Sequence, residues 1–470
     1  MDYIPTTGSD RQDMLRKIGI HSIREITKGF VPLLNSNLKL PDPLSEQELL
    51  QYLISISKLN VPTRYFVGAG CYNHYIPAAV GELIQRGEFL TGYTPYQAEV
   101  SQGILQAIYE FQSYICMLTD MDIANASLYD GPSALGEAVI LATSYNGRKN
   151  ILVEQGLHPS YLDVVSTYCR ARGLRVNTTS TYPMAHEEEA STQTQLEQLV
   201  REETACVVVQ NPDFYGNVRD LDEVSAIAHK AGALLIVSVV EPTSLAIIKP
   251  PGQYGADIVV GEGQSFGIPM CFGGPSLGFM AVQSFLLKKM PGRICGMTVD
   301  SNGKRGFILT LQAREQHIRR ERATSNITTN VALMALSSTI YLALMGRTGL
   351  KTIAEISMQR AHLLRKKLLD LGFTSLNNNN FYNEFTIGAP TPSPSENVPS
   401  MSSKDGNNVR RINNVADQKI IEEILSELSR NGIAGGYDLE NGMMVVCCTE
   451  MNGVEDIEEY KSIVIKHVVR

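Results

Sequence analysis

The sequence predicts an α/β protein in which a mostly parallel sheet carries helices on both faces and is followed by a smaller C-terminal α/β domain. From about residue 120, short β-branched runs alternate with amphipathic stretches. This is the order of elements in a parallel sheet with crossover helices. The β-branched runs are apolar at nearly every position, which is typical of strands buried on both faces. In such sheets, ligands bind at the carboxyl ends of the strands.

The length allows more than one domain. A chain of 470 residues holds about two to four domains at roughly 100–200 residues each. We expect an N-terminal helical arm at 1–65, a large domain at 66–325 and a small C-terminal α/β domain at 326–470.

The arm is expected to consist of helices joined by loops. Ser45-Glu46-Gln47-Glu48 begins a helix with apolar residues at helical spacing, and Asp10 and Ser22 are candidate caps of shorter helices. The helix that begins at Ser45 has an apolar face that includes Leu49, Leu53 and Ile56. Prolines bracket this piece, at positions 41, 43 and 62. It has too few apolar residues to form a core of its own.

The elements of the large domain follow from periodicity. The candidate strands are the apolar runs 151–153, 205–209, 234–240 and 258–260. The candidate helices between them are the amphipathic stretches 160–172, 194–201 and 220–231.

Residues 377–416 interrupt this rhythm. Asn377 begins a run of asparagines, and the stretch from Pro390 to Asn408 is poor in core-forming residues. We therefore expect a mobile polar surface insertion in this region, centred near 388–412. Beyond it, apolar residues at helical spacing predict a helix, and 443–448 predicts a strand; the helical positions are Ile420, Ile421, Ile424, Leu425 and Leu428.

Composition excludes several classes of protein. The net charge of −8 argues against a nucleic-acid partner, which normally requires a basic excess. No segment reaches the roughly 18 apolar residues of a membrane span, and no export signal is visible. We expect a cytoplasmic protein without a membrane partner. The eight cysteines form no CxxC motif, so we expect reduced thiols and no metal site.

Gly263-Gln264-Ser265-Phe266-Gly267 matches the GxSxG pattern of a hydrolase elbow and follows a candidate strand. An elbow opens directly into a helix, whereas the next residues include Pro269 and Gly273-Gly274-Pro275, which do not continue as a helix. This departure argues against an elbow, but the motif itself matches, so a serine hydrolase that uses Ser265 remains an alternative function from a different class of protein.

Leu128 to Ala138 places small residues where a helix begins. The free amides of such a helix start, together with the Ser133 hydroxyl, are suited to holding a phosphate. An ordinary helix capped by Asp130 or Ser133 explains the same residues. Both interpretations stay open at this point.

Two further segments suit an interface or a binding site. Gln312 to Arg322 is strongly basic, and Glu315 and Arg319 stand four residues apart, as an ion pair on one helix face would. A solvated helix is the ordinary outcome; a subunit interface or an anion site is the functional one. Tyr93-Thr94-Pro95-Tyr96-Gln97-Ala98-Glu99 holds two tyrosines around a proline, ahead of a helix that starts near Ala98. Such aromatics form a pocket wall or an interface anchor, or pack on the sheet.

Together these segments resemble the glycine decarboxylase P-protein family of the glycine cleavage system. The resemblance rests on long motifs spread from about residue 5 to the C-terminus: Phe66 to Pro77, Glu88 to Gly103, Asn125 to Gly131 and Gly306 to Ile327. The family occurs either as one long chain with two homologous halves or as two subunits. This chain is similar to the first half, subunit 1 (alpha).

The resemblance implies fold-type I pyridoxal phosphate architecture. In the catalytic half, a lysine in a glycine-flanked loop forms a Schiff base with the cofactor. Gln264 stands at that position here, and an amide cannot form an aldimine. In the family, an acidic residue pairs with the pyridine nitrogen of the cofactor, and the matching position here is Ser238 or Glu241. Lys249 is the other lysine near this region, and we interpret it as a surface residue. Asp130, Gly131 and Ser133 then form a vestigial phosphate loop, and no cofactor is expected covalently on this chain.

The resemblance also implies the function. The chain would pair with a lysine-bearing subunit 2 (beta), which holds pyridoxal phosphate, and the pair would decarboxylate glycine and pass the aminomethyl group to the lipoyl arm of H-protein. The tyrosine segment would contribute to the partner's site, with Tyr93, Tyr96, Gln97 and Glu99 as candidates and His74 and Tyr75 as weaker ones. A purely structural scaffold subunit is the remaining alternative.

Overall fold

The computed structural model describes residues 6–29, 40–60, 63–179, 196–377, 380–390 and 414–468. The chain divides into two compact units, 1–62 and 63–470, and each is described by itself. The division of the second unit at residue 325 stays a prediction.

In its described residues, the N-terminal unit contains the helices α1 (Gly8–Ile18), α2 (Ile23–Thr27) and α3 (Glu46–Ser57). A capping box between Ser45 and Glu48 begins α3, which confirms the predicted helix start. Ser22 is the N-cap of α2, as expected. Asp10, by contrast, is the third residue of a capping box whose N-cap is Thr7. All three predicted apolar positions of α3 are exposed: Leu49, Leu53 and Ile56.

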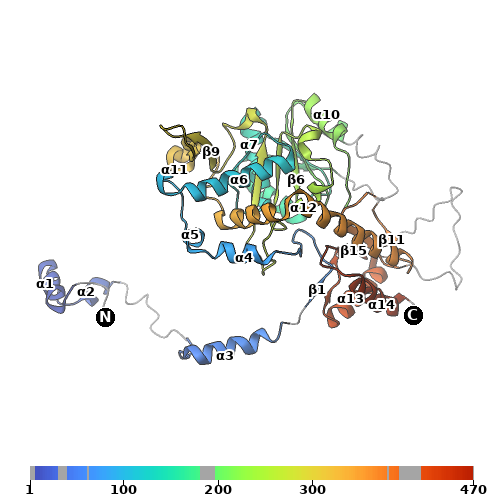
Figure 1. Cartoon of the computed structure of the whole chain (residues 1–470), viewed down its shortest axis with the longest axis horizontal. Helices are drawn as coiled ribbons and strands as arrows, with labels where there is room; N and C mark the ends of the chain where they lie inside the picture. Colours follow the sequence, from blue (N-terminus) through green and yellow to red (C-terminus); the bar gives the residue numbers. More distant parts are fainter. Residues whose placement is uncertain are drawn as a thin grey trace. The chain divides into compact units, whose positions relative to one another are not determined.

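The centre of the second unit is a seven-stranded sheet with the order β2-β8-β7-β6-β5-β3-β4 (Figure 1). Its strands are β2 (Ile123–Ala124), β3 (Asn150–Val153), β4 (Arg175–Thr178), β5 (Thr204–Gln210), β6 (Leu234–Val239), β7 (Ile258–Glu262) and β8 (Gly278–Val282). The pairs from β7 to β4 are parallel, and β8 runs antiparallel to both of its neighbours. The four predicted strands are therefore confirmed as β3, β5, β6 and β7.

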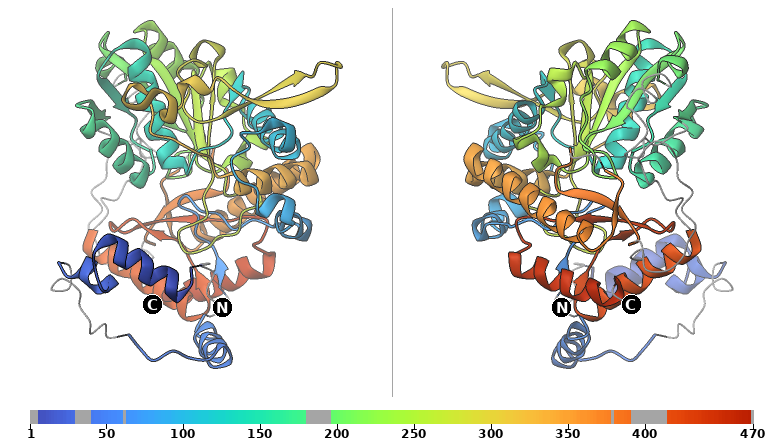
Figure 2. Two further views of the ribbon diagram at one scale, coloured as in Figure 1. Left: turned by 90° about the vertical axis from the view of Figure 1, so that its left-hand side faces the viewer. Right: turned by 90° about the vertical axis from the view of Figure 1, so that its right-hand side faces the viewer.

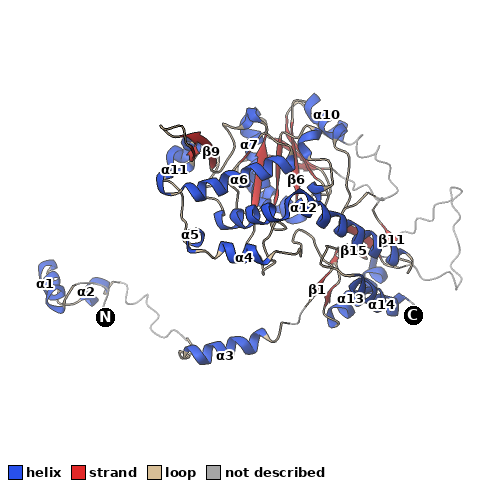
Figure 3. Cartoon of the chain, in the orientation of Figure 1, coloured by secondary structure: helices blue, strands red, loops and turns tan. Residues whose placement is uncertain are grey.

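Helices cover both faces of this sheet (Figure 3). On one face, α7 (Gly131–Asn146) and α8 (Pro159–Ala171) pack on Ile236 and Ile258. On the other face, α6 (Gln102–Thr119), α10 (Asp222–Lys230) and the first part of α12 (Ala332–Leu369) pack on Leu235 and Val259. Successive strand residues point to opposite faces, so fully apolar strands supply both cores. The helices predicted at 160–172 and 220–231 are confirmed as α8 and α10, and residues 196–199 of the third are helical.

Shorter elements lie around the sheet. Helices α4 (Ala78–Ile84) and α5 (Gly87–Leu90) precede the 3₁₀ helix η2 (Ala98–Val100). Further 3₁₀ helices are η3 (Pro242–Ala246) after β6, η4 (Pro251–Tyr254) before β7 and η5 (Ser284–Leu286) after β8. Strands β9 (Ile294–Val299) and β10 (Arg305–Thr310) form an antiparallel hairpin that stands out from its surroundings (Figure 2).

The C-terminal part forms its own apolar core. Its sheet has the order β11-β12-β15-β14, with β11 (Thr374–Ser375), β12 (Glu384–Gly388), β14 (Tyr437–Asp438) and β15 (Met443–Cys447). Helices α13 (Asn414–Arg430), α14 (Val454–Val468) and the second part of α12, beyond a non-helical Gly346, pack on this sheet. The predicted helix and strand are confirmed as α13 and β15. Strand β13 (Ile433–Ala434) pairs with β1 (Arg64–Tyr65).

The structure corrects two expectations. Asn377 is buried, and its amide donates to the carbonyl of Tyr215 and to Asn217, so the predicted surface insertion does not begin there, and residues 391–413 lie outside the described residues. The basic segment is not one helix but three short turns: η6 (Gln312–Arg314), α11 (Gln316–Arg319) and η7 (Arg320–Arg322). Arg320 has a positive φ of 53°, which interrupts helical geometry.

None of the helices in the described ranges combines the length and the apolar composition needed to cross a membrane.

Removal of residues 1–62 is expected to change the thermal unfolding midpoint of the remaining chain by less than about 2 °C. The reason is that the buried members of all five apolar clusters lie between Phe66 and Val464. The matched control is removal of residues 1–77, which also takes away Phe66 and Tyr72 and should abolish cooperative unfolding. An equal loss of stability in both deletions, measured by calorimetry, would contradict this prediction.

Candidate functional site

Gln264, Glu241 and the start of α7 meet at the carboxyl ends of β6 and β7. Gln264 follows β7, Glu241 follows β6, and Gly131 begins α7 beside them. The segment 66–77 lies across this edge, because Tyr72 bonds to Gln264 and His74 bonds to Glu241. The expectation from the sheet topology thus agrees with the position of these residues.

Gln264 is buried and fully bonded to the chain's own backbone. Its Oε1 accepts from the Tyr72 amide at 2.9 Å, and its Nε2 donates to the Tyr72 carbonyl at 3.1 Å and to the Ile268 carbonyl at 2.7 Å. A side-chain amide has two N–H donors and no nucleophilic amine. Gln264 therefore offers no group for a Schiff base, and its hydrogen-bonding atoms are already in use.

The start of α7 is a capped helix. Asp130 Oδ1 accepts from the Ser133 amide at 2.7 Å, and Ser133 Oγ completes a capping box with the Asp130 amide at 3.3 Å. The Gly131 amide donates to Glu262 Oε2 at 3.0 Å. The capped helix is confirmed, and the role of Asp130, Gly131 and Ser133 as a vestigial phosphate loop stays a prediction.

Glu262 was not expected in this role. Its Oε1 accepts from the amides of Gln264 (3.1 Å) and Leu277 (2.7 Å), in addition to the bond from Gly131 to Oε2. Burial raises the pKa of Glu262, and the hydrogen bonds from the backbone act in the opposite direction. The signal in the sequence was a charged residue at the end of an otherwise apolar strand, which normally requires buried partners.

The acid at the end of β6 is also engaged. Glu241 Oε1 accepts from the Thr243 amide at 2.9 Å, and Glu241 Oε2 accepts from the Ser265 hydroxyl at 2.7 Å. Ser238, the other candidate, is fully buried. Both positions are thus enclosed by the chain itself.

His74 lies between two carboxylates. Its Nδ1 is 2.8 Å from Glu450 Oε2, its Nε2 is 3.3 Å from Glu241 Oε2, and its side chain is 2% exposed. Burial alone would lower the pKa of His74, but the neighbouring carboxylates outweigh it and raise this pKa to about 10. The imidazole is therefore positively charged at neutral pH, and it faces the interior rather than a partner. Tyr75, the neighbouring candidate, is exposed.

The geometry of Ser265 disagrees with the serine hydrolase alternative. The Ser265 hydroxyl donates to Glu241 instead of to a histidine, and the residue is 2% exposed. The residues after it form turns and irregular structure rather than a helix. An elbow nucleophile requires an exposed hydroxyl, an adjacent base and a following helix.

Lys249 is a surface residue, as interpreted from the sequence. Its ammonium group is 3.1 Å from Asp222 and lies over the ring of Tyr254 at 3.8 Å. Both contacts hold it away from the end of β7.

The tyrosine segment lies on the surface, as a group that acts on a partner requires. Tyr93, Tyr96, Gln97 and Glu99 are exposed, Tyr93 by 89%. The ring of Tyr96 is 5.7 Å from the Arg293 guanidinium and 6.3 Å from the His317 ring. The tyrosine segment therefore packs against the basic turns.

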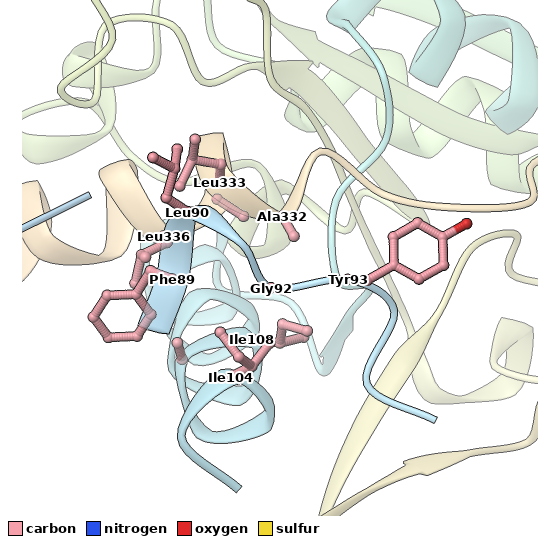
Figure 4. Close-up of a pocket in the computed structure, with 11 residues that line it drawn as sticks. Phe89, Leu90, Gly92, Tyr93, Ile104, Ile108, Ala332, Leu333 and Leu336 are labelled. Atoms are coloured by element: carbon pink, nitrogen blue, oxygen red, sulfur yellow. The ribbon is translucent and has the colours of Figure 1, made fainter. Parts of the chain in front are cut away.

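An apolar pocket of about 60 Å³ adjoins this segment. In Figure 4 the ring of Tyr93 lies apart from the apolar side chains that line the pocket, which include Phe89, Leu90, Ile104, Ile108, Leu333 and Leu336.

The basic turns do not form the ion pair expected from their spacing. Glu315 lies 4.0 Å from Arg293 and 3.5 Å from His317, rather than pairing with Arg319. The Arg314 guanidinium donates to the carbonyls of Met290 and Gly292. Their role at an interface stays a prediction.

Glu384 is another buried carboxyl group that was not expected from the sequence. Unlike Glu262, it carried no local signal. Its Oε1 accepts from the Ala69 amide and its Oε2 from the Tyr72 hydroxyl, both at 2.7 Å. Burial raises the pKa of Glu384 to about 7, although these two hydrogen bonds act against the increase. Together with Gln264, it fixes the backbone of the segment 66–77.

Comparison with known proteins was made for sequence and structure. A family model described as "Glycine cleavage system P-protein" matches residues 1–431. The chain is 43% identical over 470 residues to a probable glycine dehydrogenase (decarboxylating) subunit 1 of Desulforamulus reducens, covering 97% of this chain and 98% of that protein. It is 48% identical over 391 residues to the protein of the same description from Moorella thermoacetica, covering 82% and 86%.

Among solved structures, a glycine decarboxylase (P-protein) of the glycine cleavage system in inhibitor-bound form matches with a TM-score of 0.82 and 38% identity, covering 99% of this chain and 100% of that one. A sphingosine-1-phosphate lyase of Burkholderia pseudomallei matches with a TM-score of 0.64 and 12% identity, covering 94% of both chains. The second likeness shows the fold alone. The predicted fold-type I pyridoxal phosphate architecture is confirmed.

The raised pKa of Glu384 predicts a pH dependence of stability. The native chain keeps a proton on Glu384 that the unfolded chain releases above the usual value of 4.5, so this residue makes the unfolding free energy fall as pH rises from about 4.5 to about 7. Glu384→Gln should reduce that slope by up to about 1.4 kcal/mol per pH unit. Urea unfolding at several pH values measures the slope of the unfolding free energy against pH in each variant. Glu223→Gln, at an exposed position, is the control, and equal slopes in both variants would contradict the assignment.

Proposed function

The chain belongs to the glycine cleavage system P-protein family as a subunit 1 member, and we propose that it is the half of a split glycine decarboxylase that does not carry the cofactor. The observation that carries this proposal is Gln264, whose amide stands in the loop after β7 and is bonded to Tyr72 and Ile268. Enzymes of this fold hold pyridoxal phosphate through a lysine amine. Neither the residue type nor its contacts fit that role here.

The proposal places pyridoxal phosphate on a lysine-bearing subunit 2. When bound there, the cofactor supplies the electron sink for decarboxylation of glycine. The assembled enzyme passes the aminomethyl group to the lipoyl arm of H-protein. The reaction would take place in the cytoplasm.

The contribution of this chain to that site is the tyrosine segment. Tyr93, Tyr96, Gln97 and Glu99 are exposed on one short stretch, and their hydroxyl, amide and carboxylate groups are suited to orienting a bound polar substrate. Arg293 and His317 support the ring of Tyr96 from behind. His74 is enclosed between Glu241 and Glu450, so we assign it a positioning role within this chain. A scaffold without any contribution to the partner's site is the second candidate.

The isolated chain, incubated with pyridoxal phosphate and then borohydride, should yield no reduced lysine adduct and no decarboxylation of glycine. Both should appear when subunit 2 is added, with the adduct located by peptide mass mapping on subunit 2. An adduct on Lys249 in the isolated chain would contradict the proposal.

In the assembled enzyme, Tyr96→Phe should lower kcat/KM for glycine by about tenfold to a hundredfold, because a hydroxyl that bonds a charged or reacting group is lost. Tyr145→Phe removes the hydroxyl of a comparably exposed tyrosine on α7 and should leave turnover unchanged. If Tyr96→Phe and Gln97→Ala both leave turnover unchanged, the scaffold candidate is supported instead.

A further inference from the structure

Three backbone amides from separate elements converge on one buried carboxylate. Gly131 begins α7, Gln264 lies in the loop after β7, and Leu277 directly precedes β8. All three donate to Glu262, at 3.0, 3.1 and 2.7 Å. Such a set of inward-pointing amides at a helix N-terminus is an anion site, and in this chain a side chain of the protein already fills it.

No donor in the first turn of α7 is left for a ligand. The Gly131 amide donates to Glu262, position 132 is a proline without an amide hydrogen, and the Ser133 amide donates to Asp130. The next amide, that of Ala134, donates to the Asp130 carbonyl. The N-cap amide of Asp130 donates to Ser133 Oγ at 3.3 Å, so every N–H group that this helix start would normally leave without an intrahelical partner is bonded.

The space at this helix start is also filled. A Cβ atom added at Gly131 would meet the Tyr161 hydroxyl and would lie 3.2 Å from Glu262 Cβ. Tyr161 and Glu262 are both buried. A second anion placed here would face the charge of Glu262 in a poorly solvated site, where repulsion between like charges is strong.

We propose that Glu262 is an internal anion that takes the place of a cofactor phosphate at the start of α7, so that this subunit keeps its fold without a cofactor and excludes phosphate compounds. The correspondence with a cofactor phosphate rests on the proposed function. The stabilising role of the carboxylate rests only on its three hydrogen bonds. Gln264 completes the closure, because its side chain joins this loop to the backbone of Tyr72.

The first test removes the carboxylate. Glu262→Ala leaves three buried amides without an acceptor, so the thermal midpoint should drop, on the order of 5 °C. Acetate should then raise the midpoint of this variant relative to chloride at equal ionic strength, since a bound anion stabilises the native state. In the unchanged chain, acetate and chloride should act alike.

The control is Glu384→Ala, which removes another buried carboxyl group that is not at a helix N-terminus and accepts from a single backbone amide. It should lose stability without rescue by acetate. Equal rescue in both variants, or none in Glu262→Ala, would overturn the inference.

The second test does not require Glu262→Ala to fold. With Glu262 in place, Gln264→Lys treated with pyridoxal phosphate and borohydride should give no reduced adduct at position 264, as read by peptide mass mapping. The combination of Gln264→Lys with Glu262→Ala, where it folds, should give the adduct. An adduct in the single variant, or none in a folded double variant, would overturn the role of Glu262. An adduct on Lys249 in the unchanged chain would instead overturn the proposed function.

Discussion

The buried charge of His74, held between Glu241 and Glu450, is the interaction on which the arrangement of this chain depends. Glu241 belongs to the large sheet, Glu450 follows β15 of the C-terminal core, and His74 lies on the segment that crosses between them. Removing one member of such a buried set leaves an uncompensated charge, which typically costs about 3–5 kcal/mol. The imidazolium thus joins the two cores through this segment, alongside the hydrogen bonds from Tyr72 to Gln264 and from Thr449 to the Asn73 carbonyl.

The same segment explains why the edge of the sheet is closed. Its backbone bonds to Gln264 on one side and to Glu384 on the other. In an enzyme that holds a cofactor, the polar groups at the ends of parallel strands await a ligand. Here Gln264, Glu241 and Glu262 are bonded within the chain, whereas the buried Ser238 hydroxyl has no hydrogen-bond partner among the described residues. A buried network of this kind is stable because nearly all of its members have partners. Under the proposed function, these internal bonds would take the place of contacts to a cofactor.

Much of the fold followed from periodicity, because strands β3, β5, β6 and β7 are apolar on both faces and their helices are amphipathic. The residue type of Gln264 decides its chemistry and is read directly from the sequence, but its place at the position of a cofactor lysine stays a prediction. Glu262 and Glu384 were not predicted, because their roles depend on amides brought from distant segments. Two predictions from composition were wrong. The basic segment is not a single helix because the backbone is interrupted at Arg320. Asn377 is not on the surface because its side chain joins a buried hydrogen-bond network with Asn217.

The three amides on Glu262 also bear on the history of the chain. Once a carboxylate had satisfied them, regaining a lysine at position 264 would confer nothing by itself, and losing the carboxylate alone would carry a penalty in stability. A lysine at position 264 alone is neutral and loss of the Glu262 carboxylate alone is harmful, so only the two substitutions together would be useful. Under the proposed function, this epistasis would help to preserve the division of labour between two subunits.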